Sequence, residues 1–456
     1  MANRLSLRMS GGDWSKLRSL LFTPDGHENA AVLLCGQSVN DREDRLLVRE
    51  IIGVSSDQYI DRQRYHLEVA PRFYNSVIDR CLREHLIPVI CHSHPFDGPA
   101  RYSASDDFGE RRLLPVLESL LPRQKPASLL LTNTSVAGRV LDGSAFQSLT
   151  DVTITAPRVQ VFPIVPSRGV RKSETVLFDR QIRAFGEEGQ RTLESLTAAI
   201  VGLGGIGSLV AEQLVRAGVG KLILVDFDTV ESSNLNRLFG GTSASVGQSK
   251  VRVVANHLTS IRPLGIDAIC DSVLKQSILK RLRVADLILG CVDSDLARSV
   301  LTRFAYQYLT PLIDLGIRLD ARKGGVTAAG GRVSVVGVDG SCLRCSHHIN
   351  PDRVRAESLP PAEREALARE GYVMGIDEPT PAVVTLNCAI AGLGATAALN
   401  LFVNLTGRFQ PASQLYDATA GIVFTATPVH EPGCDICDGE QGVKALGDLQ
   451  VVSAYD

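Results

Sequence analysis

Two histidines, a serine and an aspartate between residues 92 and 106 have the types and spacing of a metal site. His92 and His94 lie two residues apart at the end of an expected strand, so both imidazoles project from the same side. Asp106 becomes a third ligand if the following helix turns back toward the strand. Imidazole and carboxylate ligands suit zinc, and three protein ligands plus water form the open pattern of catalytic zinc sites. Ser103 and Asp106 also have the spacing of a helix-capping box, so a purely structural role is the alternative.

A second group of residues predicts a nucleotide site. The sequence VGLGGIGS follows an apolar strand and opens a helix, and its glycines let the backbone approach a phosphate: Gly202, Gly204 and Gly207. Asp226 ends the next strand, where it is well placed for a ribose hydroxyl. This pattern alone fits a dehydrogenase equally well.

Three further charged residues favour a nucleoside triphosphate. Arg237 and Lys250 follow the second strand and offer two fixed cations that can neutralise a leaving phosphate, which hydride transfer does not require. Asp293 lies at the end of another apolar strand, where open parallel sheets bind their ligands. Its carboxylate can hold the Mg²⁺ that accompanies ATP.

Four cysteines form two CxxC pairs, Cys342 with Cys345 and Cys434 with Cys437. Each pair has the spacing of half a tetrahedral zinc site. Together they predict a structural zinc whose four positions are all filled by the protein. A reactive dithiol is the weaker alternative for two such pairs.

The elements that must position these residues fall into two groups. Strands and helices mix in residues 1–155, which predicts an α/β domain. The elements expected there are strands at 30–36, 46–54 and 86–95 and a helix at 106–121. The Pro-punctuated segment 156–172 is expected to be a linker or an extended docking segment. In residues 173–456 apolar strands alternate with amphipathic helices, which predicts a doubly wound, Rossmann-like α/β domain.

Composition narrows the class of protein. A chain of 456 residues is too long for one ordinary core. Its 48 basic and 50 acidic residues nearly cancel and form no basic tract, so we expect no nucleic-acid partner. No apolar run is expected to reach the roughly 18 residues of a membrane span, and the polar N-terminus lacks a signal peptide. We therefore expect a cytoplasmic protein whose ten cysteines are reduced.

The first motif, H-x-H-P followed by S-x-x-D, resembles that of the JAMM (JAB/MPN) metalloproteases. The resemblance implies a domain with a mixed sheet that cleaves peptide or isopeptide bonds after the C-terminal glycines of ubiquitin-like proteins. The catalytic zinc ligands that it implies are His92, His94 and Asp106. It further implies that Ser103 steadies the oxyanion and that Glu28 is the general base, with Glu50 as the rival for that role.

The rest of the chain, from LFDRQIRAFGEEGQRTL to CDIC, resembles the ThiF/MoeB and ubiquitin-activating-enzyme superfamily. The resemblance implies that ATP and Mg²⁺ are used to adenylate the C-terminal glycine of a ubiquitin-like protein, with release of pyrophosphate. The residues implied around the nucleotide are Gly202, Gly204, Gly207, Asp226 and Asp228. Those implied at the phosphates and magnesium are Asn234, Arg237, Lys250 and Asp293. Arg180 matches an arginine that reaches into the partner subunit's site, which implies a homodimer, and the CxxC pairs match a structural zinc site.

A nucleophilic cysteine is not evident from the sequence. Activating enzymes that form a thioester or persulfide often carry it after the first CxxC pair, but residues 346–381 contain none. Cys388 is the nearest candidate, on an apolar helix that we expect to face the core. The cysteines expected in the core are Cys35, Cys81, Cys91, Cys270 and Cys291. A separate thiol is then expected to receive the activated product.

The leading hypothesis is a bifunctional bacterial enzyme that acts on the C-terminus of a ubiquitin-like protein. One half matures a precursor or removes it from targets, and the other activates it for conjugation, for example in antiviral defence. A conjugating-enzyme-like protein or a sulfur donor is then a further partner. The first alternative is an activator of a sulfur carrier in cofactor or secondary-metabolite biosynthesis. The second is a scaffold in which one of the two sites is degenerate.

Overall fold

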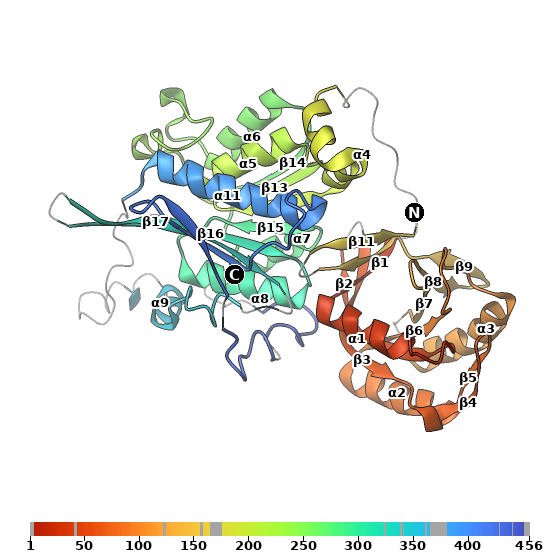
Figure 1. The fold of residues 1–456 in the computed structure, drawn as a ribbon. Helices are drawn as coiled ribbons and strands as arrows, with labels where there is room; N and C mark the ends of the chain where they lie inside the picture. The colour runs from red at the N-terminus through yellow and green to blue at the C-terminus, as the bar shows by residue number, and fades with distance from the viewer. Residues whose placement is uncertain are drawn as a thin grey trace. The chain divides into compact units, whose positions relative to one another are not determined.

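The chain forms two compact units in the computed structural model, Met1–Arg168 and Gly169–Asp456 (Figure 1). The structure describes residues 4–40, 43–121, 125–155, 158–164, 176–322, 325–337, 340, 342–360, 363–364, 381–427, 429–439 and 441–450. The division between the two units falls within the segment 156–172, which was expected to separate two domains.

The first unit is built on a nine-stranded mixed sheet in the order β11-β10-β1-β3-β2-β6-β7-β8-β9. Its strands are β1 Arg4–Met9, β2 Ala30–Val39, β3 Glu43–Gly53, β6 Ile87–Ser93, β7 Ala127–Leu131, β8 Val136–Asp142, β9 Ala145–Ser148, β10 Asp151–Ile154 and β11 Gln160–Pro163. The pairs of β1 with β3 and of β6 with β7 are parallel, whereas β2 runs antiparallel to both β3 and β6. A small hairpin, β4 Tyr59–Arg62 and β5 Leu67–Val69, pairs separately.

Side chains on β2 alternate between the two faces of this sheet, as the twofold period of a strand requires. Leu33 packs in the same core cluster as Leu17 of helix α1, Gly11–Leu21. Leu34 instead packs with Phe73 of helix α2, Pro71–Glu84. Helix α3, Ala104–Leu120, buries Leu114 and Leu117 in a third cluster beside Leu141. Both faces of the sheet are thereby covered.

Two features of the first unit differ from the sequence-based expectation. The segment 156–172 was expected to be a linker or docking segment, but β11 lies within it and pairs antiparallel with β10. The first strand, β1, was not predicted, because its alternating apolar residues Leu5, Leu7 and Met9 span only a few positions and such a short signal is weak. Several of the remaining residues of the segment, 165–172 among them, lie outside the described part.

The second unit is built on an eight-stranded sheet in the order β14-β13-β12-β15-β16-β17-β18-β19. The first five strands are parallel and the last three antiparallel. The strands are β12 Thr197–Val201, β13 Lys221–Val225, β14 Gly265–Ile269, β15 Leu287–Gly290, β16 Leu312–Arg322, β17 Gly325–Val336, β18 Ser413–Asp417 and β19 Ile422–Ala426. This arrangement confirms the predicted Rossmann-like fold.

Helices cover both sides of the parallel strands, with α5 and α6 on one side and α8 on the other (Figure 1). The helices of this unit are α4 Asp179–Ser195, α5 Gly205–Ala217, α6 Lys250–Ile261, α7 Gln276–Leu282, α8 Asp295–Gln307, α9 Pro351–Glu357 and α11 Val384–Val403. Since α5 and α8 each follow a central parallel strand, their N-termini lie at the carboxyl edge of the sheet, where such folds bind ligands.

Helix α11 contradicts the expectation that no apolar run reaches the length of a membrane span. Its 20 residues make it long and apolar enough to cross a membrane, by length and composition alone. Within the unit it packs along α5 and strand β16, and 67% of its most apolar window is buried. Burial of this extent is typical of a core helix in a doubly wound domain.

Candidate metal and nucleotide sites

The predicted metal ligands of the first unit converge at the end of β6. His92 Nε2 lies 3.1 Å from Asp106 Oδ1, and His94 Nε2 lies 3.4 Å from Asp106 Oδ2. One ligand atom from each of the three residues lies within 4.8 Å of the others. Strand β6 presents the imidazoles, and the first turn of α3 brings the carboxylate toward them, as the spacing predicted.

The state of these ligand atoms fits a metal ion. His92 Nε2 is buried and makes no hydrogen bond to any described residue, although Asp106 is near. A buried imidazole nitrogen without a hydrogen-bond partner is costly unless a ligand takes its lone pair. Burial opposes ionisation of Asp106, but the two neighbouring imidazoles outweigh it and lower the pKa of Asp106 below its usual range. Two imidazoles and one ionised carboxylate suit zinc.

The two candidates for the general base lie in different environments. Glu28 precedes β2, is 6% exposed, and its Oε1 lies 3.6 Å from His94 Nε2. Burial raises the pKa of Glu28 above its ordinary value. Glu50, on β3, makes a bidentate pair with Arg80 at 2.8 and 2.5 Å. The structure therefore brings Glu28, and not Glu50, to the metal ligands.

Ser103 has the capping role that the sequence left open as an alternative. Its Oγ accepts a hydrogen bond from the Asp106 backbone nitrogen at 3.2 Å, and Asp106 Oδ2 accepts one from the Ser103 nitrogen at 2.6 Å. A hydroxyl that accepts in this way keeps its own proton to donate. Capping and oxyanion stabilisation by Ser103 are therefore compatible.

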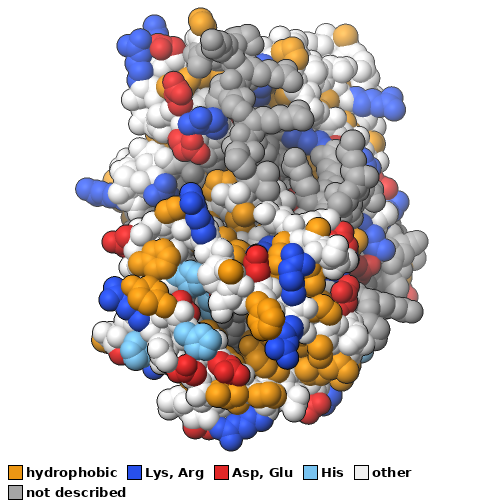
Figure 2. Space-filling model, turned by 90° about the vertical axis from the view of Figure 1, so that its right-hand side faces the viewer, with side chains coloured by type: hydrophobic (Ala, Val, Ile, Leu, Met, Phe, Trp, Pro, Cys, Tyr) orange, Lys and Arg blue, Asp and Glu red, His pale blue; other side chains and the backbone are white. Residues whose placement is uncertain are grey.

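A cavity of about 420 Å³ opens beside these residues. Glu28, His92, His94 and Asp106 form its polar wall. Its apolar lining is contributed largely by β2, the β4–β5 hairpin region, α2 and α3: Val32, Leu67, Val69, Phe73, Ile90 and Leu113. On one face of the chain, histidine side chains lie next to acidic and hydrophobic ones (Figure 2).

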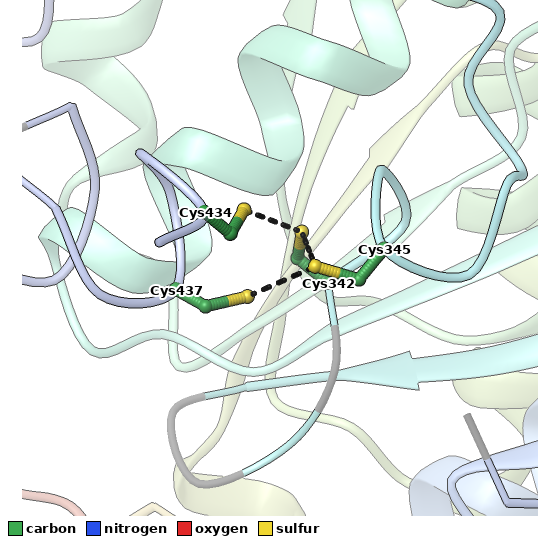
Figure 3. Close-up of side chains that lie close together, drawn as sticks. All are labelled: Cys342, Cys345, Cys434 and Cys437. Atoms are coloured by element: carbon green, nitrogen blue, oxygen red, sulfur yellow. Dashed lines mark hydrogen bonds between the residues drawn. The ribbon is translucent and has the colours of Figure 1, made fainter. Parts of the chain in front are cut away.

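The four CxxC cysteines of the second unit gather as predicted (Figure 3). The Sγ atoms of Cys342 and Cys345 are 3.7 Å apart, those of Cys342 and Cys434 are 3.8 Å apart, and those of Cys345 and Cys437 are 3.8 Å apart. Four sulfurs bound tetrahedrally at the usual zinc–sulfur length are about 3.8 Å apart. This spacing exceeds that of a disulfide and fits a closed structural zinc site.

Replacing Cys434 with serine is expected to remove this zinc and to destabilise the second unit by several kcal/mol, since structural zinc binding is coupled to folding. The metal content and the thermal unfolding of the variant check the expectation. Cys270 is exposed, so Cys270→Ser is the matched control and should retain full metal content. A Cys434→Ser protein with wild-type zinc content and stability would contradict a four-cysteine site.

The glycine-rich turn between β12 and α5 is packed against neighbouring backbone. Gly202 has φ of +87°, and a Cβ added there would lie 2.6 Å from the carbonyl oxygen of Cys291. A Cβ on Gly207 would lie 1.9 Å from the carbonyl oxygen of Gly202. Gly204 is the N-cap of α5, and a Cβ there meets nothing within 4 Å. The glycines thus let α5 begin immediately at the strand end, with its N-terminal amides available to a phosphate.

Gly207→Ala is expected to destabilise the second unit by about 1–3 kcal/mol, because the added methyl must displace backbone in a packed turn. Gly204→Ala, which has room for the methyl, should unfold near the wild-type temperature. Thermal unfolding of the two variants in the absence of nucleotide checks this difference. Equal unfolding temperatures would show that the turn is looser than its packing indicates.

Asp226 joins the glycine turn to the loop after β13. Its Oδ2 accepts a hydrogen bond from the Leu203 nitrogen at 2.6 Å, and its Oδ1 accepts one from the Asp228 nitrogen at 2.8 Å. Burial raises the pKa of Asp226. Lys250 begins α6, and its Nζ lies 2.7 Å from Asp228 Oδ2. The predicted nucleotide residues therefore meet at the ends of β12 and β13.

Arg237 lies against the same turn, together with a residue that the sequence did not reveal. A Cβ added to Gly205 would lie 3.3 Å from Arg237 Cβ and 2.0 Å from Asn387 Nδ2. Asn387 is 3% exposed and belongs to the apolar helix α11. A polar amide within such an apolar helix is the feature of the sequence that could have indicated this residue. Asn234 Oδ1 accepts a hydrogen bond from the Glu231 nitrogen at 3.2 Å, so it shapes the loop that carries Arg237.

Asp293 is exposed in the turn between β15 and α8, and no described side chain pairs with it. The preceding residue is held by Arg298, whose Nη2 donates to the Val292 carbonyl oxygen at 2.7 Å. Arg298 also lines a second cavity, of about 790 Å³, with Arg332 and glycines of β16 and β17. Both guanidinium groups contact the buried Asp314. Arg298 thus connects the Asp293 turn to this cavity.

The remaining site predictions concern Arg180 and the cysteines outside the two CxxC pairs. Arg180 is exposed on α4 and no described side chain pairs with it. The structure of a single chain therefore does not test its expected role in a partner subunit's site. Cys388 was expected to face the core but is exposed, because α11 buries the preceding Asn387 instead. Cys270, also expected in the core, is exposed, and Cys291 is partly exposed. The expectation holds for the buried Cys35, Cys81 and Cys91.

Comparisons with known proteins show which family the second unit matches. The model of the ThiF family matches residues 178–436. The molybdopterin-synthase adenylyltransferase of Escherichia coli (strain K12) is 30% identical over 273 residues, covering 58% of this chain and 96% of that protein. The sulfur carrier protein adenylyltransferase of Thermus thermophilus is 29% identical over 288 residues, covering 61% and 96%. Ubiquitin-like modifier-activating enzyme 5 of Oryza sativa subsp. japonica is 28% identical over 280 residues, covering 58% and 60%.

Proposed function

Because this chain belongs to the ThiF family, we propose that its second unit uses ATP to adenylate the C-terminal glycine of a ubiquitin-like or sulfur-carrier protein. One observation supports this proposal above all. The glycine turn, Asp226 and Lys250 lie close together at the carboxyl ends of adjacent parallel strands. Relatives of similar sequence are named as adenylyltransferases for a sulfur carrier and as activating enzymes for ubiquitin-like modifiers.

In the proposed reaction the carboxylate of the protein substrate attacks the α-phosphorus of ATP. A new oxygen–phosphorus bond forms, the bond to the β-phosphate breaks, and pyrophosphate leaves. The amides at the start of α5 bind phosphate oxygens, and Lys250 and Arg237 neutralise the charge that develops on the leaving group. Asp293 would hold Mg²⁺, which would screen the charge of the phosphates.

The second cavity supports a route for the protein substrate. It is lined by guanidinium groups and by the backbone of Gly316, Gly330 and Gly331. Arg298 borders the cavity and also fixes the turn that carries Asp293. An extended C-terminus that ends in a carboxylate is therefore expected to enter here and to approach the α-phosphate. In a homodimer, the exposed Arg180 would complete the partner subunit's site.

For the first unit we propose a zinc-dependent peptidase of the JAMM type. The fit of His92, His94 and Asp106 to a metal, with the buried His92 nitrogen left without a hydrogen bond, supports it. A zinc ion held there would lower the pKa of a water molecule and polarise the carbonyl of the scissile bond. Glu28, 3.6 Å from His94, is placed to accept the proton of that water and to return it to the leaving amine. Ser103 keeps a proton to donate to the developing oxyanion.

The two proposed activities have one substrate in common, the C-terminus of a ubiquitin-like protein. The first would expose or release the terminal glycine, and the second would activate it. Conjugation to target proteins, as in a bacterial antiviral pathway, is one outcome. Activation of a sulfur carrier is the other, and the relative that is named as a sulfur carrier protein adenylyltransferase, covered over 96% of its length, favours it. The nearly complete residue sets in both units argue against a scaffold with a degenerate site.

ATP–pyrophosphate exchange, measured with purified candidate carrier proteins, tests the adenylation proposal. Exchange that requires a carrier with an exposed terminal glycine would support it, and no exchange with any such carrier would contradict it. Mass analysis of the product after sulfide or a conjugating-enzyme-like protein is added separates the two outcomes. A thiocarboxylate identifies sulfur transfer, whereas a thioester on Cys388 or on the second protein identifies conjugation.

A further inference from the structure

Helix α3 carries one candidate zinc ligand, Asp106, whereas the other two come from β6. A metal site of this kind is precise only if the helix is fixed relative to the sheet. Both hydrogen bonds of the capping box join Ser103 and Asp106 within the first turn, so they orient Asp106 but do not tie the helix to a strand. Another group must therefore set the distance between Asp106 and the histidines.

Arg139 is such a group. It lies on β8 and is 8% exposed. Its Nη1 lies 2.6 Å from Asp107 Oδ1 and its Nε lies 2.8 Å from Glu110 Oε2. Asp107 is the neighbour of Asp106, and Glu110 follows one turn later on the same face of α3. One guanidinium thus binds α3 at two positions that directly follow the candidate ligand, one and four residues after Asp106.

The guanidinium is itself immobilised. Its central carbon lies 3.6 Å from the ring centroid of Tyr102 and 3.7 Å from that of Phe146, so it is stacked between two aromatic rings. Ser128 Oγ donates to Glu110 Oε2 at 2.8 Å, and the Tyr102 hydroxyl lies within hydrogen-bond distance of the same Oγ, at 3.1 Å. Arg139, Glu110 and Ser128 are buried, which makes the hydrogen bonds among them stronger and more rigid than they would be in water.

The network reaches β7, the strand that pairs with β6 at His92. Ser128 and Arg139 are directly opposite each other in the antiparallel pair of β7 and β8. Strand β7 pairs in turn with β6, where Leu130 is opposite His92. A continuous path of strand pairing and side-chain hydrogen bonds therefore joins His92 to the first turn of α3.

From this geometry we infer that Arg139 is a positioning residue that holds Asp106 at the distance required for zinc binding by His92 and His94. The inference rests on the proposed peptidase site of the first unit. Lysine at position 139 keeps the charge but cannot bind Asp107 and Glu110 as a planar fork or stack in the same way. Loss of a residue that supports a metal ligand commonly weakens metal binding by roughly 10- to 100-fold.

The test measures zinc affinity of the full chain by chelator competition, which also reports the four-cysteine site as an internal reference. Arg139→Lys should bind the first-unit zinc roughly 10- to 100-fold more weakly, while the cysteine site is unchanged. Asp107→Asn, which alters a half-exposed partner, should show a smaller loss with little change in the unfolding temperature of the metal-free protein.

Arg111→Lys is the matched control. Arg111 is also on α3 and stacks on the same Phe146 at 4.7 Å, but it donates to the Ser144 carbonyl oxygen rather than to the first turn. Its zinc affinity should equal that of the wild type. Wild-type affinity in Arg139→Lys, or an equal loss in Arg111→Lys, would overturn the inference. Zinc bound only at the cysteines in the wild type would instead overturn the peptidase proposal and the inference with it.

Discussion

Lys250→Ala is expected to slow ATP–pyrophosphate exchange by roughly 100- to 1,000-fold, the usual effect of removing one charge-stabilising group from a transition state. Lys250 is held at the start of α6, and its Nζ lies 2.7 Å from Asp228 Oδ2, beside the loop fixed by Asp226. A charge that is already positioned costs no reorganisation when pyrophosphate departs. The ammonium group is therefore expected to act mainly on the rate and less on the affinity for ATP.

Lys275→Ala serves as the control for that experiment. Lys275 makes a comparable ion pair, 2.9 Å from Asp271, but it lies before α7 rather than at the glycine turn. Its removal should leave exchange unchanged. Peptide cleavage by the first unit should persist in both variants. If Lys250→Ala exchanged pyrophosphate at the wild-type rate, the nucleotide site would have to lie elsewhere.

Glu28→Gln is expected to lower peptide cleavage by roughly 100- to 10,000-fold, the range for loss of a general base. Glutamine has the shape of glutamate but cannot accept the proton of the attacking water. Since Glu28 Oε1 lies 3.6 Å from His94 and is not one of the three converging ligands, the zinc content should remain at the wild-type level. Cleavage of a glycine-terminated fusion and metal analysis of the same sample measure both quantities.

Glu50→Gln separates the two candidates for the base. Glu50, on β3, is paired with Arg80 of α2 and not with the candidate metal ligands. This variant should therefore cleave at nearly the wild-type rate and lose only a partly exposed ion pair. Full activity of Glu28→Gln together with an inactive Glu50→Gln would reverse the assignment. Loss of zinc from Glu28→Gln would show that Glu28 is a ligand rather than a base.

The residues that sequence predicted best are those whose chemistry is encoded over short distances. His92 lies on β6 and His94 directly follows its last residue, each CxxC pair is four residues long, and the glycine turn is bounded by a strand and a helix. Local geometry decides the direction of these side chains. The position of Asp106 relative to the histidines depended on how α3 packs back against the sheet. Because the capping residue fixes where this helix begins, few other positions were open to Asp106.

The residues that sequence could not predict act through contacts between distant segments. Arg139 reaches Asp107 and Glu110 from a strand about 30 positions away, and Asn387 approaches Gly205 from a helix much later in the chain. Charge and polarity alone do not reveal such partners. The exposure of Cys388 was missed for a related reason: an apolar run shows that a helix is buried but not which face its neighbours cover.

The most direct test is intact-mass spectrometry of a ubiquitin-like protein with a C-terminal extension, incubated with this chain, zinc and Mg-ATP. The account predicts that the extension is lost and that the shortened protein then gains the mass of an adenylate. Glu28→Gln should block the first change, whereas Lys250→Ala should block only the second. An unchanged mass for every carrier tried, together with no pyrophosphate exchange, would contradict the account of an enzyme that acts on such a terminus.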